Sequence, residues 1–163
     1  MNYLKLYFMK KMWITVILFV GFGTLCTAQE FKVVTIVESI VPGGIGRSRI
    51  IETQTEINAD EFTTERTDGK NSRQNEISRS DVKVNLFDET KLLNFYSLGG
   101  INFQNIASND ALITSKINKL VKKGWKLTFI SSAVESDAGK DDGNGIFITR
   151  LFFSRDKTEE EKD

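Results

Sequence analysis

The sequence predicts a single α+β domain, in which an antiparallel β-sheet packs on one main α-helix, preceded by a signal peptide. Three observations support this prediction: segments rich in β-branched residues separated by turn residues, one stretch of apolar residues at helical spacing that ends at a glycine, and a basic and then apolar N-terminus. Without the first 28 of its 163 residues, the chain would keep about 135 residues, which suits one domain with a modest core.

Residues 1–28 have the three parts of a secretory signal in the required order. A positive front formed by Lys5, Lys10 and Lys11 precedes the apolar run Met12–Leu25, and the small residues that follow predict cleavage after Ala28. The apolar run has about 14 residues, whereas a helix needs about 20 to cross a bilayer. We therefore expect a removed signal, a periplasmic or secreted protein, and contact with the membrane only during export.

In an alternative interpretation, Cys26 is the lipid-bearing first residue of a lipoprotein. Lipoprotein signals usually carry Leu three places before the cysteine and a small residue directly before it, but here Gly23 and Leu25 occupy these places in the inverted order. Cleavage after Ala28 is therefore favoured. Because Cys26 is the only cysteine, such cleavage would leave no disulfide, thiol nucleophile or thiolate metal site.

The composition excludes several classes of function. The chain has no histidine, so it lacks the usual general base near neutral pH, the commonest zinc ligand and a serine or cysteine triad of the familiar kind. It has 22 basic and 22 acidic residues, and loss of the three signal lysines would leave 19 against 22, a net charge of −3. Because the basic residues are scattered, we expect no nucleic-acid binding.

The first half of the exported chain predicts a hairpin followed by a polar segment. Phe31–Val41 and Arg47–Ile57 are rich in β-branched residues and flank a glycine-rich turn, with Ile51 and Glu52 on opposite faces of the second strand. Asn58–Asp81 is too polar to bury much surface, and we expect a long mobile excursion with its tip near Asp68-Gly69.

The middle of the chain predicts short strands and then the main helix. Alternation predicts a strand at Val82–Leu86, and an apolar segment at Leu92–Phe103 is interrupted by two glycines. Ser108-Asn109-Asp110 offers an N-cap for a helix at Asn109–Lys123, which Gly124 would end. The helix would bury the apolar residues Ile113, Ile117, Leu120 and Val121 and cover its outer face with Lys116, Lys119, Lys122 and Lys123.

The C-terminal part predicts a second hairpin. Trp125–Val134 and Ile146–Ser154 have the composition of strands, and the polar, Gly- and Asp-rich segment Glu135–Gly145 would form a long loop between them. The domain would then span residues 29–155. Residues 156–163 are charged and should form a frayed tail.

The segment Ile113–Leu127 (ITSKINKLVKKGWKL) combines a helix pattern, Gly-Trp, one charged residue and Leu before a strand. With the opening strand Phe31–Glu38, it resembles a small bacterial domain-of-unknown-function family with the order strand, helix, Gly-Trp-Glu-Leu, strand, strand. The resemblance extends over roughly Asp110–Arg155, and Lys126 stands where Glu is usual. It implies a small antiparallel sheet covered by one helix, in a secreted uncharacterised protein, and no catalytic residues.

The glycine-rich segment before Arg47, Ser48 and Arg49 is the most suggestive local motif, because backbone N–H groups of such turns can cradle an anion. A phosphate loop needs a helix directly after it, whereas β-branched residues follow here, so a hairpin turn is favoured. Arg47 and Arg49 share a strand face and could bind a carboxylate, sulfate or phosphate. Pairing with Glu38 or a neighbouring acid is the favoured alternative.

Three further groups are weaker candidates. Asp137, Asp141 and Asp142 could hold calcium, but their spacing does not match the helix-loop-helix pattern, and a solvated loop is favoured. Asn94 and Tyr96 would share a face of an extended segment and could form a binding surface, although aromatic residues at such spacings usually belong to the core. Acid pairs with possible acid-base roles are Glu52 with Glu56 and Asp141 with Asp142.

The sequence thus favours a binding or interaction module without catalytic activity or cofactor, with an envelope protein or a small anionic ligand as its partner. Two alternatives stay open. A small envelope hydrolase would use carboxylates or a Ser-Lys pair, and would show two carboxylates facing each other in a cleft or a lysine within hydrogen-bond reach of a serine. A structural component of an envelope complex would show an exposed apolar sheet face that no helix covers.

Overall fold

A computed structural model of the chain describes residues 7, 28–39, 48–97, 99–135 and 145–157. The chain divides into two compact units, residues 1–29 with 156–163, and residues 30–155. In the first unit, the Lys157 N–H donates a hydrogen bond to the Ala28 carbonyl oxygen at 2.8 Å. Apart from Tyr7 and Ala28, the predicted signal, with Cys26, lies outside the described residues, and so does most of the predicted tail. The fold described below belongs to the second unit.

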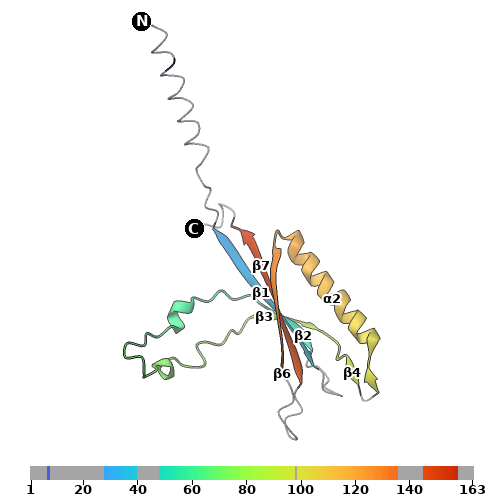
Figure 1. Cartoon of the computed structure of the whole chain (residues 1–163), viewed down its shortest axis with the longest axis horizontal. Coiled ribbons are helices and arrows are strands. Elements are labelled where there is room, and N and C mark those ends of the chain that lie inside the picture. The colour runs from blue at the N-terminus through green and yellow to red at the C-terminus, as the bar shows by residue number, and fades with distance from the viewer. Residues whose placement is uncertain (1–6, 8–27, 40–47, 98, 136–144, 158–163) are drawn as a thin grey trace. The chain divides into compact units, whose positions relative to one another are not determined.

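The β-branched segments pair in one antiparallel sheet with strand order β3-β2-β1-β7-β6, and one main helix lies alongside it (Figure 1). This arrangement confirms the predicted α+β class. A hairpin of two strands with two residues each forms a second, small sheet. The element bounds are β1 Gln29–Ser39, β2 Arg49–Thr53, β3 Phe87–Lys91, β4 Tyr96–Ser97, β5 Gly100–Ile101, α2 Phe103–Lys122, β6 Lys126–Glu135 and β7 Ile146–Asp156.

The first predicted hairpin is confirmed in its pairing, although β2 ends at Thr53, four residues before the predicted end. In the antiparallel register, Val34 of β1 lies opposite Glu52, and Ile36 lies opposite Ile50. The turn residues 42–46 lie outside the described residues. This register places Val34, Ile36, Ile50 and Glu52 on one face of the sheet.

The strand predicted at Val82–Leu86 is wrong, because the strand that forms is β3, which begins at Phe87 and has the polar sequence FDETK. It pairs antiparallel with β2, from Arg49 opposite Lys91 to Thr53 opposite Phe87. An edge strand tolerates charged side chains because only one of its two sides pairs with another strand. Backbone pairing with β2 here overrides the low strand propensity of the sequence FDETK.

The polar excursion at 58–81 contains two short 3-10 turns, η1 Ala59–Phe62 and η2 Gln74–Glu76, and its side chains are mostly exposed. The predicted turn at Asp68-Gly69 is present. Gly69 has a positive φ of 68°, and the Asp68 carboxylate accepts hydrogen bonds from the N–H groups of Lys70 and Asn71. The mobility of this segment stays a prediction.

Helix α2 begins six residues earlier than the sequence predicts. Its N-cap is Asn102, whose side chain accepts a hydrogen bond from the Asn105 N–H, whereas the predicted cap residue Asn109 is buried inside the helix. The predicted end is confirmed, because Gly124 has a φ of 84° and its N–H donates to the Val121 carbonyl oxygen.

Strands β6 and β7 form the predicted C-terminal hairpin, with a register shift between Leu127 and Phe129. The core lies between α2 and the sheet, and Ile113 and Ile117 of α2 pack against it. Its buried members are Val34, Ile36, Ile50, Leu92, Leu120, Trp125, Leu151 and Phe153. One face of the sheet is therefore committed to the helix.

Candidate functional site

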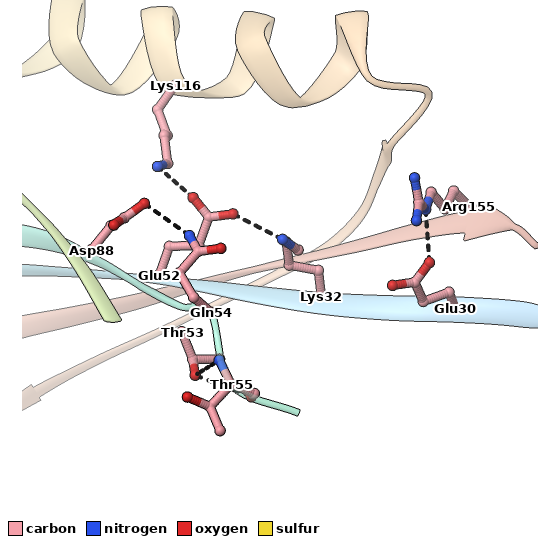
Figure 2. Close-up of polar contacts among 9 residues, drawn as sticks. All are labelled: Glu30, Lys32, Glu52, Thr53, Gln54, Thr55, Asp88, Lys116 and Arg155. Atoms are coloured by element: carbon pink, nitrogen blue, oxygen red, sulfur yellow. Dashed lines mark hydrogen bonds and ion pairs between the residues drawn. The ribbon is translucent and has the colours of Figure 1, made fainter. Parts of the chain in front are cut away.

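Glu52 of β2 is a carboxylate buried between the sheet and α2, and it binds two lysines (Figure 2). Lys32 of β1 donates to Oε1 at 2.9 Å, and Lys116 of α2 forms an ion pair with Oε2. The side chains of Glu52 and Lys116 are only 8 % and 12 % exposed. The prediction that Lys116 covers the outer face of the helix is wrong, because its ammonium group turns inward to the second carboxylate oxygen of Glu52.

Trp125 extends this charged cluster along the sheet. The ring is buried, the Lys32 Nζ lies 5.3 Å from its centroid, and the Arg155 guanidinium lies 4.7 Å from it. Arg155 also donates to the Glu30 carboxylate at 2.7 Å (Figure 2). Cations over an indole face are held by the ring quadrupole. The buried Trp125 is thus a core residue and does not line a groove.

Two opposing effects set the pKa of Glu52. Burial alone would raise it, but the hydrogen bonds and positive charges of Lys116 and Lys32 outweigh burial and hold the pKa below its ordinary value. The carboxylate is therefore charged at neutral pH and unsuited to donate a proton there. The cluster joins helix to sheet, and its chemistry is that of a structural ion network.

The stability difference between the wild-type protein and the variant Glu52→Gln should depend on pH. Because the folded protein lowers the pKa of Glu52 from an unfolded value of about 4.3, its charge stabilises the fold above that pH. This contribution is lost as the pH falls through the folded pKa. Denaturant unfolding should show a difference that is constant above about pH 5 and shrinks below about pH 4.

Ionisation of Glu38 has the opposite effect on the pH dependence of the total stability, and this effect must be separated from that of Glu52. Burial raises the pKa of Glu38, partly countered by the Asn109 hydrogen bond and reinforced by Asp110, so stability gains as the pH falls through the folded pKa. Both proteins keep Glu38, and its effect cancels in the difference. A difference that stays the same at every pH would contradict the assignment to Glu52.

The structure assigns a structural partner to each described member of the predicted arginine site. Arg49 donates to Glu89 of β3 at 2.5 Å, which is the cross-strand pairing that the sequence favoured, with Glu89 as the acid. Ser48 is buried, and its hydroxyl oxygen accepts from the Ser39 N–H at 3.0 Å. Both line a surface hollow of about 240 Å³ with Glu89 and Lys91. Arg47 lies outside the described residues.

Asn94 and Tyr96 lie in the connection before α2. The Asn94 side-chain amide donates to the Tyr96 carbonyl oxygen at 2.9 Å, and the Tyr96 side chain is exposed. Phe95 packs instead on Phe147 of β7, with ring centroids 6.2 Å apart. Phe103 is exposed at the start of the helix. These aromatic residues therefore have different environments: Phe95 packs on another ring, whereas Tyr96 and Phe103 are exposed.

The proposed carboxylate sites receive no support from geometry. Asp137, Asp141 and Asp142 lie outside the described residues, and within the described ranges no three acidic side chains come close enough to share a metal ion. Glu52 binds lysines, whereas Glu56 lies beyond the end of β2. The Ser-Lys alternative needs a lysine bound to a serine. Lys32 and Lys116 are both bound to the Glu52 carboxylate instead.

One surface hollow does collect acidic residues. It has a volume of about 330 Å³, and Glu56, Glu61 and Asp81 contribute to its lining. All three side chains are exposed. Catalytic carboxylates that act as acid and base are set apart by desolvation or by close charged partners, and these solvated groups lack that environment. The hollow does not favour the hydrolase.

The sheet face opposite α2 carries exposed apolar side chains. Side chains alternate along a strand, so the neighbours of the helix-facing residues point away from the helix. We call this surface the open face. Its aromatic and aliphatic members Phe31, Val33, Phe87 and Phe129 are 67, 36, 44 and 62 % exposed, and Phe129 packs on Phe152 with ring centroids 5.8 Å apart.

The sequence did not reveal the residues that matter most in either place. Glu52 and Lys116 read as solvent-facing charges. Glu52 lies two residues after Ile50, and Lys116 lies four residues before Leu120, so each is on the same side of its element as a buried residue. In β1 the residues of the open face alternate with residues that face the helix. The sequence of β1 has apolar residues on both faces, so it carries no alternation that marks the open face.

Comparison of the chain with protein-family models, with curated proteins and with solved structures gave no match. The resemblance to the Gly-Trp family therefore stays a prediction. Among the described residues, no helix combines the length and apolar character needed to cross a bilayer.

Proposed function

We propose that this protein is a non-enzymatic interaction module, exported to the periplasm or secreted, that binds an envelope protein on its open face. The observation that carries the proposal is the exposure of Phe31, Val33, Phe87 and Phe129 on a sheet face that α2 leaves uncovered. Large apolar side chains exposed on one face of a sheet are costly in water and can mark an interaction site. A role as a structural component of an envelope complex rests on the same observation.

The charges of the open face indicate the kind of partner. By register, Arg49 and Lys91 lie on this face, and Arg150 follows because it alternates with the buried Leu151. Glu89 pairs with Arg49, so the remaining charge of these four residues is positive. The matching surface is apolar with acidic groups beside the apolar part, because complementary charges fix orientation and speed encounter.

Export is the second part of the proposal. It is supported by the positive front, the short apolar run and the small residues before Gln29. The absence of cysteine after Ala28 also suits an oxidising compartment, because no thiol is left to oxidise. A partner in the same compartment follows from this location.

The double variant Phe31→Glu/Phe87→Glu should abolish binding of the partner while the fold is retained. Both side chains are exposed, so the changes should shift stability little, whereas they place negative charge on a surface that fits an acidic partner. The measurement is quantitative co-purification of envelope proteins from the native host, with the melting temperature checked by circular dichroism. We expect at least tenfold loss of one protein, equal to about 1.4 kcal/mol.

A matched control makes the same kind of change away from the open face. Phe103→Glu/Val121→Glu also replaces two exposed apolar residues, here on α2, and should leave co-purification unchanged. Equal losses in both double variants would show a nonspecific effect of charge. Undiminished binding by the open-face variant would contradict the proposal.

A further inference from the structure

Strand β6 forms one edge of the five-stranded sheet, and apart from one register shift its described residues carry none of the features that usually prevent strand addition. It is ten residues long, contains no proline, and has charges only at its first and last residues, Lys126 and Glu135. Native edge strands are usually short, bulged or charged along their length. The register shift near Thr128 leaves Phe129–Glu135 as a regular strand.

The opposite edge of the same sheet provides the contrast. Strand β3 has five residues, and three of them, Asp88, Glu89 and Lys91, are charged. These charges protect that edge from association. The two edges of the sheet thus differ in charge and length, and of the two only β6 is suited to pairing with another strand.

The side chains of β6 are exposed on both faces of the sheet. Leu127, Ile130 and Val134 are 38, 52 and 56 % exposed, and Phe129 lies on the open face. Pairing with another strand would bury parts of these side chains against cross-strand neighbours, as well as satisfy the outward backbone groups. The strand therefore has both the backbone and the apolar surface of an interior strand.

The charge pattern of β6 matches a second copy of itself. In an antiparallel pair of identical strands, the Lys126 end of one copy lies beside the Glu135 end of the other, so opposite charges meet at both ends. A parallel pair would bring like charges together. The contact would be isologous, with the same strand contributed by each copy around a two-fold axis, which is the commonest symmetry of soluble oligomers.

We propose that two copies of this chain associate through antiparallel pairing of their β6 strands, so that the two sheets become continuous. The inference is independent of the proposed function, because it concerns the strand edge and not the face. A monomeric protein would overturn it and leave the open-face proposal standing.

The first test is the mass of the exported protein in solution, measured by sedimentation velocity over a range of concentrations. We expect a reversible dimer. Ile130→Lys places a charge on the paired strand at a half-exposed position and should weaken dimerisation by at least tenfold, while circular dichroism shows the wild-type fold. A monomer at all concentrations up to about 1 mM would overturn the proposal, since dissociation constants above this correspond to less than about 4 kcal/mol.

A charge exchange tests the antiparallel arrangement itself. Lys126→Glu makes both ends of the strand acidic and Glu135→Lys makes both ends basic, so each variant alone should dimerise roughly tenfold more weakly. A mixture of the two variants should form a mixed dimer, and Lys126→Glu/Glu135→Lys should recover wild-type affinity. Lys119→Glu on α2 is the control and should change nothing. A dimer unaffected by Ile130→Lys and by both single charge variants would place the interface elsewhere.

Discussion

The variant Glu52→Gln is expected to lower the free energy of unfolding by about 3 kcal/mol at neutral pH. The change keeps the shape of the side chain but removes the negative charge that Lys32 and Lys116 share, and Lys116 is nearly buried. Leaving one partner of a buried ion pair uncompensated is strongly destabilising. Denaturant unfolding followed by circular dichroism measures the loss.

Glu89→Gln is the matched control, because this carboxylate also pairs with a cation across neighbouring strands but is 45 % exposed. Its loss should cost less than about 1 kcal/mol. The double variant Glu52→Leu/Lys116→Met should recover much of the stability, because apolar residues of similar size can replace a buried pair. Equal effects of Glu52→Gln and Glu89→Gln would show that burial of the Glu52 cluster contributes nothing special.

The variant Asn109→Ala is expected to destabilise the protein by about 3 kcal/mol, although alanine is the better helix former. The Asn109 side chain is 1 % exposed, and its amide accepts from the Leu93 N–H and donates to the Leu93 carbonyl oxygen, each at 2.7 Å. It thus satisfies both backbone groups of a connecting residue that has no strand partner. Leaving these part-buried backbone groups of Leu93 without a partner carries the main cost.

Hydrogen exchange distinguishes this role from a simple packing defect. The Leu93 amide should exchange at least tenfold faster in Asn109→Ala, beyond the change seen at Ile50 in the core. Asn118→Ala, at an exposed position of the same helix, should be neutral or slightly stabilising. If the Leu93 and Ile50 amides accelerate by the same factor, the variant has only lowered global stability.

Asn109 also shows where prediction from the sequence fails. Ser108-Asn109-Asp110 has the composition of an N-cap, but Asn102 has the same ability and lies where the chain leaves the β4–β5 hairpin. Local sequence cannot show which of two capping residues begins a helix when tertiary contacts determine the choice. Here the hydrogen bonds between Asn109 and the Leu93 backbone place Asn109 inside the helix. The end of the helix was predictable because Gly124 alone adopts the left-handed conformation there.

Some strands were likewise predictable from local sequence, and others were not. β1, β6 and β7 were predictable because their β-branched and aromatic residues have few alternatives. β3 was not, because its sequence FDETK forms a strand only by pairing with β2. The open face was not predictable from β1, because apolar residues occur on both faces of this strand. The inward turn of Lys116 depends on the position of Glu52 on another element. The arginine motif was predicted as a binding site from its composition alone, and the structure gives Arg49 and Ser48 partners within the sheet.

The measurement that tests the interaction surface most directly is site-specific photo-crosslinking in the native host. A photoreactive amino acid replaces Val33 on the open face in one strain and Asn118 on the outer side of α2 in another. We predict one discrete adduct with an envelope protein from position 33, absent from position 118 and lost when Phe31→Glu/Phe87→Glu is added. No adduct at position 33, or the same adducts from both positions, would contradict binding through the open face.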